Sequence, residues 1–189
     1  MITITQKEFE KLADYINKNY GIHLKEEKKV LIINRLYDEL VKNNFTNFTQ
    51  YYEHIVSDKF GETLIALIDK ITTNYTFFMR EADHFYYFRD KVLPYLLLTV
   101  HEKDLRIWSA GCSSGQEPYT IAMIFNDYLK DDKKLWDTKI LATDISSKAL
   151  NKAIKGIYSN DEIESLPSLW KLNYFRKLDD QNYTIINEI

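Results

Sequence analysis

A short turn with a glycine at each end is the first feature of this sequence that could bind a ligand. The turn, Gly111 to Gly115, follows the apolar, β-prone run LRIWSA at 105–110 and precedes a predicted helix. Glycines at such a strand–helix turn let a ligand approach the backbone closely. The turn has neither the G-x-G-x-x-G pattern of dinucleotide sites nor the G-K-[ST] ending of a P-loop. Simple binding of nucleotide phosphates is therefore not supported, and a turn that only reverses the chain is the plainer alternative.

Two acidic residues lie close to this turn in the predicted topology. Asp144 follows the strand-like run KILAT at 139–143. An acid at the end of a parallel strand can accept hydrogen bonds from both hydroxyls of an adenosine ribose, whereas the alternative role is the N-cap of the next helix. Glu117 lies just inside the helix after the turn, where an acid interacts favourably with the helix dipole. It could equally meet a cationic group, such as the positive end of a sulfonium cofactor.

The segment TTNYTFFMRE at 72–81 has no helical or strand periodicity and combines hydroxyls, aromatic rings and charges. Such a composition is typical of a functional loop. Arg80 carries a forked pair of donors that suits a carboxylate. A structural salt bridge with a nearby acid is the alternative for Arg80.

Two consecutive strand–helix units position these residues. The strand at 105–110 leads to a helix at 118–129, and the strand at 139–143 leads to a helix at about 147–155. This order predicts a parallel α/β sheet whose carboxyl ends carry the turn and Asp144. Beyond it, LNYFRKL, DDQ and NYTII predict a hairpin of two short strands.

The front of the chain predicts a four-helix unit. Thr5 and Glu8 form a capping box for a first helix that ends at Gly21. A second helix is expected over 25–42 with Ile33, Leu36, Tyr37 and Leu40 buried, a third begins after a cap at Asn47, and a fourth covers 64–71. We therefore expect an all-helical domain at 1–72 and an α/β domain at 73–189. Two further helical pieces, 81–93 and 95–101, should be separated at Pro94.

Composition and charge exclude several classes of protein. The formal charge of −3 gives no general attraction to nucleic acid. The longest apolar stretch, 92–100, is too short to cross a bilayer, and the first residues lack the features of a secretion signal. A lone cysteine, Cys112, fits a reducing cytoplasm and reads as a small packed residue instead of a nucleophile. Four scattered histidines give no support to a metal site.

Three segments of the sequence resemble the CheR family of protein-glutamate O-methyltransferases. They are 73–81 (TNYTFFMRE), 106–119 (RIWSAGCSSGQEPY) and 141–145 (LATDI), and they occur in the family's order. The second segment is highly specific, and the similarity extends over essentially the whole chain. The family's T-x-F-F-R-E aligns without a gap from Thr76 to Glu81, with Met79 in place of the second phenylalanine, which is a tolerable apolar replacement.

The resemblance implies an all-helical domain followed by the first part of a Rossmann-like domain that binds S-adenosylmethionine. It also implies methylation of glutamate side chains on chemoreceptors in chemotaxis, with S-adenosylhomocysteine as the product. Asn74, Thr76 and Arg80 would reach over the cofactor, Glu117 would help to hold it, and Asp144 would hold its ribose. With glutamate as the implied substrate, Arg80 is also our candidate for steering the substrate carboxylate. We add Gly111 and Gly115 as the turn against which the cofactor lies.

The resemblance further implies a partner and leaves two functions open. Arg35, in the motif N-R-L, matches a basic position of the helix by which the family is thought to meet the receptor's helical region, although a solvated helix face is an equal alternative. Members of the family continue beyond the hairpin with further strands, so the chain is expected to be truncated. The hairpin resembles the start of a β-subdomain that grips a receptor tail in some members. The alternative function is a receptor-docking module without catalysis.

Overall fold

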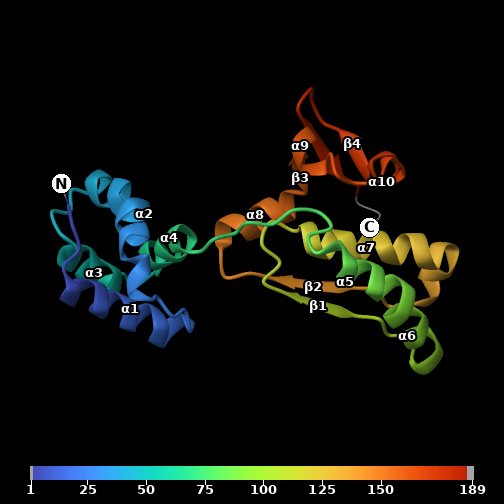
Figure 1. Cartoon of the computed structure of the whole chain (residues 1–189), viewed down its shortest axis with the longest axis horizontal. Helices are drawn as coiled ribbons and strands as arrows, with labels where there is room; N and C mark the ends of the chain where they lie inside the picture. Colours follow the sequence, from blue (N-terminus) through green and yellow to red (C-terminus); the bar gives the residue numbers. More distant parts are fainter. Residues whose placement is uncertain (1, 187–189) are drawn as a thin grey trace. The chain divides into compact units, whose positions relative to one another are not determined.

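The computed structural model describes residues 2–186, and these fall into two compact units divided between Thr73 and Asn74 (Figure 1). The first unit is helical. The second combines helices with a parallel and an antiparallel sheet.

The helical unit follows the predicted pattern. Thr5 and Glu8 form the expected capping box, and Gly21 ends the first helix in a left-handed conformation with φ of 67°. Asn47 caps the third helix by accepting a hydrogen bond from the backbone of Gln50. The elements are α1 (Gln6–Tyr20), the 3₁₀ turn η1 (Glu26–Lys28), α2 (Lys29–Lys42), α3 (Phe48–Ser57) and α4 (Glu62–Ile71).

The core of this unit differs from the prediction at α2. Leu36 and Leu40 are buried as expected, but Ile32 completes the buried stripe, while Ile33 is only partly buried and Tyr37 is 37% exposed. Positions 32, 36 and 40 repeat every four residues, so the buried face is rotated from the one that the sequence suggested.

Tyr51 on α3 is fully buried, and its hydroxyl has no hydrogen-bond partner within residues 2–186. Burial raises the pKa of Tyr51, so the hydroxyl stays protonated. An unpaired buried polar group costs about 1–3 kcal/mol. We therefore expect Tyr51→Phe to leave the free energy of unfolding unchanged or to raise it by about 1 kcal/mol in chemical denaturation.

The matched control for this prediction is Tyr158→Phe. The Tyr158 hydroxyl is also buried but donates a hydrogen bond of 2.7 Å to the carbonyl of Ser114. Its removal should lower the free energy of unfolding by about 1–2 kcal/mol, because that carbonyl loses its partner. A loss of stability for Tyr51→Phe as large as that for Tyr158→Phe would contradict the prediction.

The second unit opens with one long helical stretch where two pieces were predicted. α5 (Ala82–Tyr87), the π-helical turn η2 (Phe88–Val92) and α6 (Leu93–Thr99) follow one another without a break. Pro94 stands in the first turn of α6. The wider π turn just before it, closed by a bond from the Leu93 backbone to the carbonyl of Phe88, adapts the hydrogen-bond ladder ahead of the proline. The predicted separation at Pro94 is therefore wrong.

Two parallel strands form the sheet that carries the candidate site. β1 (Ile107–Ala110) pairs with β2 (Ile140–Thr143), with Ile107 opposite Ile140. α7 (Gln116–Leu129) and the 3₁₀ turn η3 (Lys130–Leu135) connect the strands, and α8 (Ser147–Lys155) follows β2. Ile107 and Ile140 pack with α6 and α7 in one apolar cluster. The opposite face is open, with Trp108 66% and Leu141 61% exposed.

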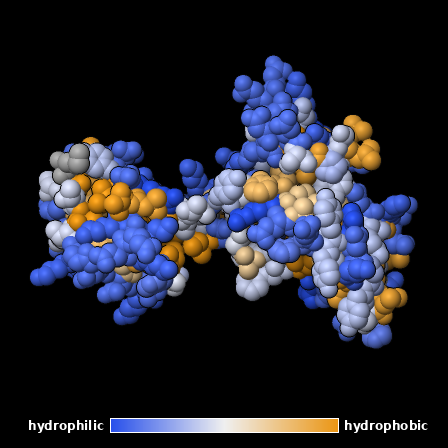
Figure 2. Space-filling model, viewed as in Figure 1, coloured by the Kyte–Doolittle hydropathy of each residue, from blue (hydrophilic) through white to orange (hydrophobic). Residues whose placement is uncertain are grey.

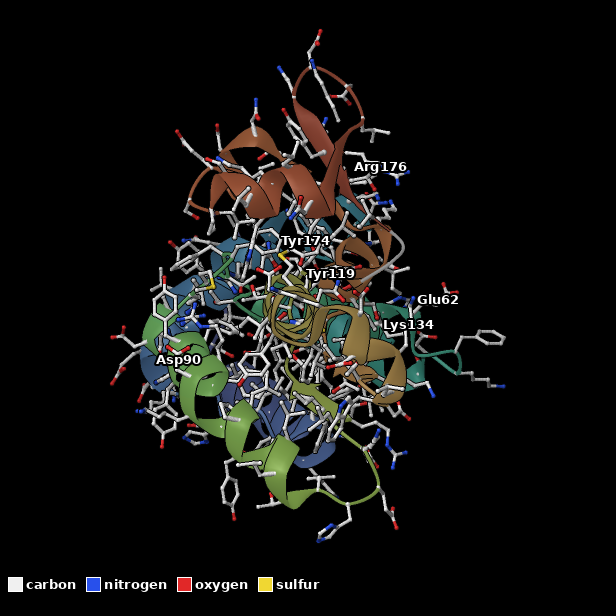
Figure 3. The ribbon with its side chains drawn as sticks, turned by 90° about the vertical axis from the view of Figure 1, so that its right-hand side faces the viewer. Glu62, Asp90, Tyr119, Lys134, Tyr174 and Arg176 are labelled. Atoms are coloured by element: carbon white, nitrogen blue, oxygen red, sulfur yellow. The ribbon has the colours of Figure 1, made fainter. Side chains whose placement is uncertain are left out.

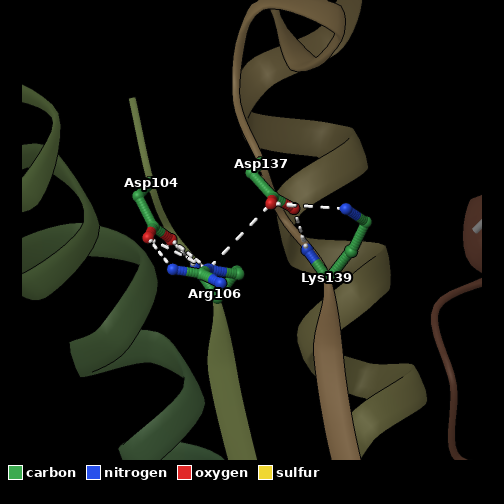
Figure 4. A network of polar contacts seen from close by, with 4 residues as sticks. All are labelled: Asp104, Arg106, Asp137 and Lys139. Carbon is green, nitrogen blue, oxygen red and sulfur yellow. Dashed lines mark hydrogen bonds and ion pairs between the residues drawn. The ribbon is translucent and has the colours of Figure 1, made fainter. Parts of the chain in front are cut away.

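Charged residues join the two strands at the ends opposite the candidate site (Figure 4). Arg106 lies between Asp104 and Asp137, and Lys139 also pairs with Asp137 at 3.4 Å. Hydrogen bonds from Arg106 lower the pKa of Asp104 to about 2. Arg106 and Lys139 are solvent-exposed and the two aspartates partly so, and ion pairs in such a setting contribute little to stability.

The predicted hairpin belongs to a three-stranded antiparallel sheet. β4 (Phe175–Lys177) and β5 (Asn182–Ile185) form the hairpin, and β3 (Ile157–Ser159) pairs with the other edge of β5. The short helices α9 (Asn160–Ile163) and α10 (Ser168–Tyr174) lie between β3 and β4 in the chain. β3 was not expected from the sequence.

This small sheet packs on α7. Tyr119 of α7 and Tyr174 at the end of α10 belong to the same apolar cluster, and Figure 3 shows them in the layer between α7 and the sheet. Asp127 of α7 accepts hydrogen bonds from the Trp170 indole, at 2.5 Å, and from the Tyr174 hydroxyl. The sheet is thus attached to the same helix that begins at the glycine turn.

Some apolar surface remains exposed on the second unit. Leu169 and Leu172 of α10 are 69% and 78% exposed, and Figure 2 shows a hydrophobic patch over that helix. No helix among residues 2–186 is both long and apolar enough to cross a membrane.

Candidate functional site

The glycine turn after β1 is fixed to the end of β2. The backbone N–H groups of Gly111 and Cys112 both donate to the carbonyl of Thr143, each at 2.8 Å. Ser113 adopts a left-handed conformation with φ of 50°. The parallel pairing of the strands therefore brings the turn next to the residue that follows Thr143, which is Asp144.

The Asp144 carboxylate connects two loops. One oxygen, Oδ2, accepts the Ser113 N–H at 2.7 Å, and the other, Oδ1, accepts the Ser146 N–H at 2.8 Å. Ser146 is the N-cap of α8, because its hydroxyl accepts the backbone N–H of Ala149 at 3.1 Å. The alternative that Asp144 caps the helix is therefore wrong. Each carboxylate oxygen has a second lone pair that can accept a ligand hydroxyl.

Glu117 lies in the first turn of α7 and reaches back to β1. Its Oε1 accepts a hydrogen bond of 2.6 Å from the hydroxyl of Ser109, which is buried in the strand. This bond fixes the direction of the carboxylate, while Glu117 as a whole stays exposed. The arrangement gives the turn two oriented carboxylates, one of which could attract a cation and one of which could bind hydroxyls.

The segment 74–81 contacts the turn through its first residue. The carbonyl of Asn74 accepts the Ser113 hydroxyl at 3.2 Å. Arg80 is exposed and donates from Nη1 to the carbonyl of Tyr75 at 2.9 Å. Within the described part of the chain Arg80 forms no ion pair, which contradicts the alternative of a structural salt bridge. Neither Thr76 nor Arg80 bonds to the turn or to Asp144 among these residues.

The two glycines of the turn differ in the space around them. Both have positive φ, 83° for Gly111 and 95° for Gly115. A Cβ on Gly111 would point into open space, so the backbone there is accessible to a ligand. A Cβ on Gly115 would lie 2.9 Å from both the Ala153 Cβ and the Tyr158 hydroxyl. Gly115 is therefore required by packing against α8 and β3, and the ligand-facing role assigned to it has no support from this contact.

Cys112 is buried in the same turn, with 1% of its surface exposed. Burial raises the pKa of its thiol, and the negative charges of Asp144 and Glu117 raise it further. A thiol that stays protonated is a poor nucleophile. The structure thus agrees with a packing role for this residue.

Sequence reasoning missed the small polar residues that organise the site. Ser109 forms one of the bonds described above, Ser113 and Ser146 form two each, and the Tyr158 hydroxyl donates to the carbonyl of Ser114. The sequence offered two signals. One was a hydroxyl at an otherwise apolar strand position, Ser109, and the other was a serine in each of the turns after the strands, Ser113 and Ser146. These signals do not identify the partners.

Two recesses of the second unit do not coincide with this site. The larger, of about 1060 Å³, lies among α7, η3, β2 and α8 and shares only Gly115 with the proposed residues. The smaller, of about 420 Å³, is lined by Phe77, Phe78 and Met79 together with residues of α5, η2, α7, α10 and the loop before α10. The candidate site is instead the open surface beside Gly111 and Asp144.

The guanidinium of Arg35 is hydrogen-bonded within the helical unit. Its Nη1 donates to the carbonyls of Lys70, Ile71 and Thr72 at 3.2, 2.8 and 3.0 Å, and its Nη2 donates to the Thr73 hydroxyl at 3.1 Å. The side chain is partly buried. The alternative of a solvated helix face therefore does not describe this residue.

Comparison with known families assigns both units. The family described as "CheR methyltransferase, all-alpha domain" matches residues 7–72. The family described as "CheR methyltransferase, SAM binding domain" matches residues 74–189.

Curated relatives align with nearly all of the chain. A chemotaxis protein methyltransferase of Borreliella burgdorferi is 44% identical over 187 residues, which are 97% of this chain and 66% of the relative. Chemotaxis protein methyltransferase 2 of Vibrio cholerae is 30% identical over 100% of this chain and 65% of its own length. The Escherichia coli chemotaxis protein methyltransferase is 33% identical over 93% of this chain and 59% of its own length. The chain thus spans less than two thirds of each of these relatives.

Proposed function

Because the chain belongs to the CheR methyltransferase family, we propose that it binds S-adenosylmethionine and takes part in methylation of glutamate side chains on chemoreceptors. The observation that carries this proposal is the Asp144 carboxylate, which is held by the backbone of Ser113 and Ser146 at the mouth of the glycine turn. The named relatives are chemotaxis methyltransferases, which supports chemoreceptors as partners.

The chemistry of the residues beside the turn suits this cofactor. S-adenosylmethionine supplies an electrophilic methyl group on a positively charged sulfur and carries a ribose with two hydroxyls. Asp144 has lone pairs left to accept those hydroxyls. Glu117, oriented by Ser109, offers a negative charge to the cationic end. The open space beside Gly111 lets the backbone meet a ligand directly.

Arg80 is the residue to which we assign the substrate carboxylate. A glutamate has a reference pKa of about 4.3, so it is already ionised at neutral pH and needs no general base. The protein's task is then to orient the carboxylate oxygen and exclude water. Arg80 has donors left after its bond to Tyr75 and no acid to neutralise it within residues 2–186, which leaves its charge available for a substrate.

Calorimetric titration with S-adenosylhomocysteine, combined with methyl-transfer assays on receptor, tests this function. We expect saturable 1:1 binding to the chain. Arg80→Ala should lower methyl transfer by about 100-fold, because the substrate loses its orienting donor, while S-adenosylhomocysteine affinity falls by about tenfold or less.

Arg89→Ala is the matched control. Arg89 is also exposed but is neutralised by Asp90 at 2.6 Å, so its loss should change neither quantity. Normal transfer by Arg80→Ala would remove the role proposed for that residue. Receptor binding without any binding of S-adenosylhomocysteine would instead support the second candidate, a docking module without catalysis.

A further inference from the structure

Arg35 binds the end of α4 in the way that a helix cap does. The last carbonyls of a helix lack intrahelical donors and are commonly satisfied through a glycine in the left-handed conformation. α4 has no such glycine, because its C-cap, Thr72, is extended with φ of −72° and ψ of 147°. The guanidinium of Arg35 donates to the carbonyls of Lys70, Ile71 and Thr72 instead.

The positive charge of Arg35, like its geometry, suits the carboxyl end of α4. The carboxyl end of a helix carries a partial negative charge, which a cation stabilises. One turn further along α2, Glu39 pairs with Lys70 at 3.5 Å, so α2 holds the end of α4 at a second point. A planar guanidinium can serve several acceptors at once, whereas a lysine ammonium in the same place would be a single point donor.

The bound residues lead directly into the segment that carries Asn74, Thr76 and Arg80. Nη2 of Arg35 donates to the Thr73 hydroxyl, and Thr73 is followed in the chain by Asn74. We propose that Arg35 is a positioning residue that fixes residues 70–73 and thereby the start of the segment 74–81, in place of a docking contact to the receptor. The effect on the cofactor rests on the proposed function, whereas the anchoring of 70–73 does not.

The experiment compares Arg35→Ala, Arg35→Lys and Lys28→Ala. Lys28 is exposed and ends η1, directly before α2, so its replacement removes one positive charge near the start of that helix and none of the bonds to α4. Three quantities are measured: amide hydrogen exchange of residues 70–76, affinity for S-adenosylhomocysteine, and affinity for receptor at low and high salt. Circular dichroism and thermal unfolding report general damage to the helices.

We expect Arg35→Ala to speed exchange at 70–76 by about tenfold or more and to weaken S-adenosylhomocysteine binding severalfold. Arg35→Lys should recover less than half of either effect, although it keeps the charge, and Lys28→Ala should change neither. The proposal is overturned if exchange at 70–76 stays at the wild-type rate, or if Arg35→Lys restores receptor binding that Arg35→Ala and Lys28→Ala both lose.

A second variant covers the case in which Arg35→Ala does not fold. Thr73→Val removes only the hydroxyl that accepts from Nη2 and leaves the helix cap in place. It should speed exchange at 73–76 by severalfold, and unchanged exchange there would count against the proposal. If the wild-type chain fails to bind S-adenosylhomocysteine, the proposed function fails while the exchange data still decide the role of Arg35.

Discussion

Replacing Asp144 with alanine is expected to weaken S-adenosylhomocysteine binding by at least about 100-fold, equivalent to about 2.7 kcal/mol. The substitution removes the acceptor proposed for the two ribose hydroxyls, and hydrogen bonds to a charged group contribute about 1.5–3 kcal/mol each. It also leaves the backbone N–H groups of Ser113 and Ser146 without the partner that joins their loops. Calorimetric titration measures the change directly.

Asp144→Asn separates the contributions of charge and shape. An asparagine has one acceptor oxygen, so it can hold only one of the two backbone N–H groups and presents donors to the other. We therefore expect it to behave almost as badly as alanine. Asp137→Ala, which lies three residues before β2 in the ion network around Arg106, should bind normally. Wild-type affinity in Asp144→Ala would mean that the nucleoside binds elsewhere and that Asp144 only joins the loops.

Gly115→Ala is expected to lower the free energy of unfolding of the second unit by about 3 kcal/mol. The left-handed backbone conformation of Gly115 costs a residue with a Cβ about 1 kcal/mol. The new methyl group would also lie 2.9 Å from the Ala153 Cβ and 3.1 Å from the Ala153 Cα. Overpacking of this kind costs about 1–3 kcal/mol, because the backbone of α8 must move. Chemical denaturation followed by circular dichroism measures the loss.

Two comparisons identify the cause of that loss. Gly111→Ala shares the positive φ but has open space around its Cβ, so it should cost only about 1 kcal/mol. Adding Ala153→Gly to Gly115→Ala removes one colliding methyl group and should restore part of the stability. Equal losses at the two glycines would show that backbone conformation, and not the contact with α8, dominates.

Local sequence signals predicted most of the elements. The Thr5–Glu8 capping box and Gly21 mark both ends of α1, and Asn47 marks the start of α3. The change from helical period to short apolar runs marks β1 and β2, and their parallel pairing follows from the strand–helix order. Asp144 could be placed beside the glycine turn for the same reason, because the carboxyl ends of parallel strands meet.

Contacts between distant residues were not predictable in this way. β3 has three residues and acquires its strand character from pairing with β5, about 25 positions later in the chain. Whether Pro94 breaks a helix or is accommodated by a π turn depends on hydrogen bonds formed before it. Arg35 was judged from its helix alone, whereas its partners belong to α4 and the residues just after it.

The burial of Cys112 has a practical consequence for experiments on this chain. It is the one cysteine of the sequence, and its thiol is enclosed and held protonated by its surroundings. Maleimides and oxidants react with accessible thiolates, so they should leave the native protein unmodified. Spectroscopic labels can therefore be attached to cysteines introduced at exposed positions without first removing a natural one.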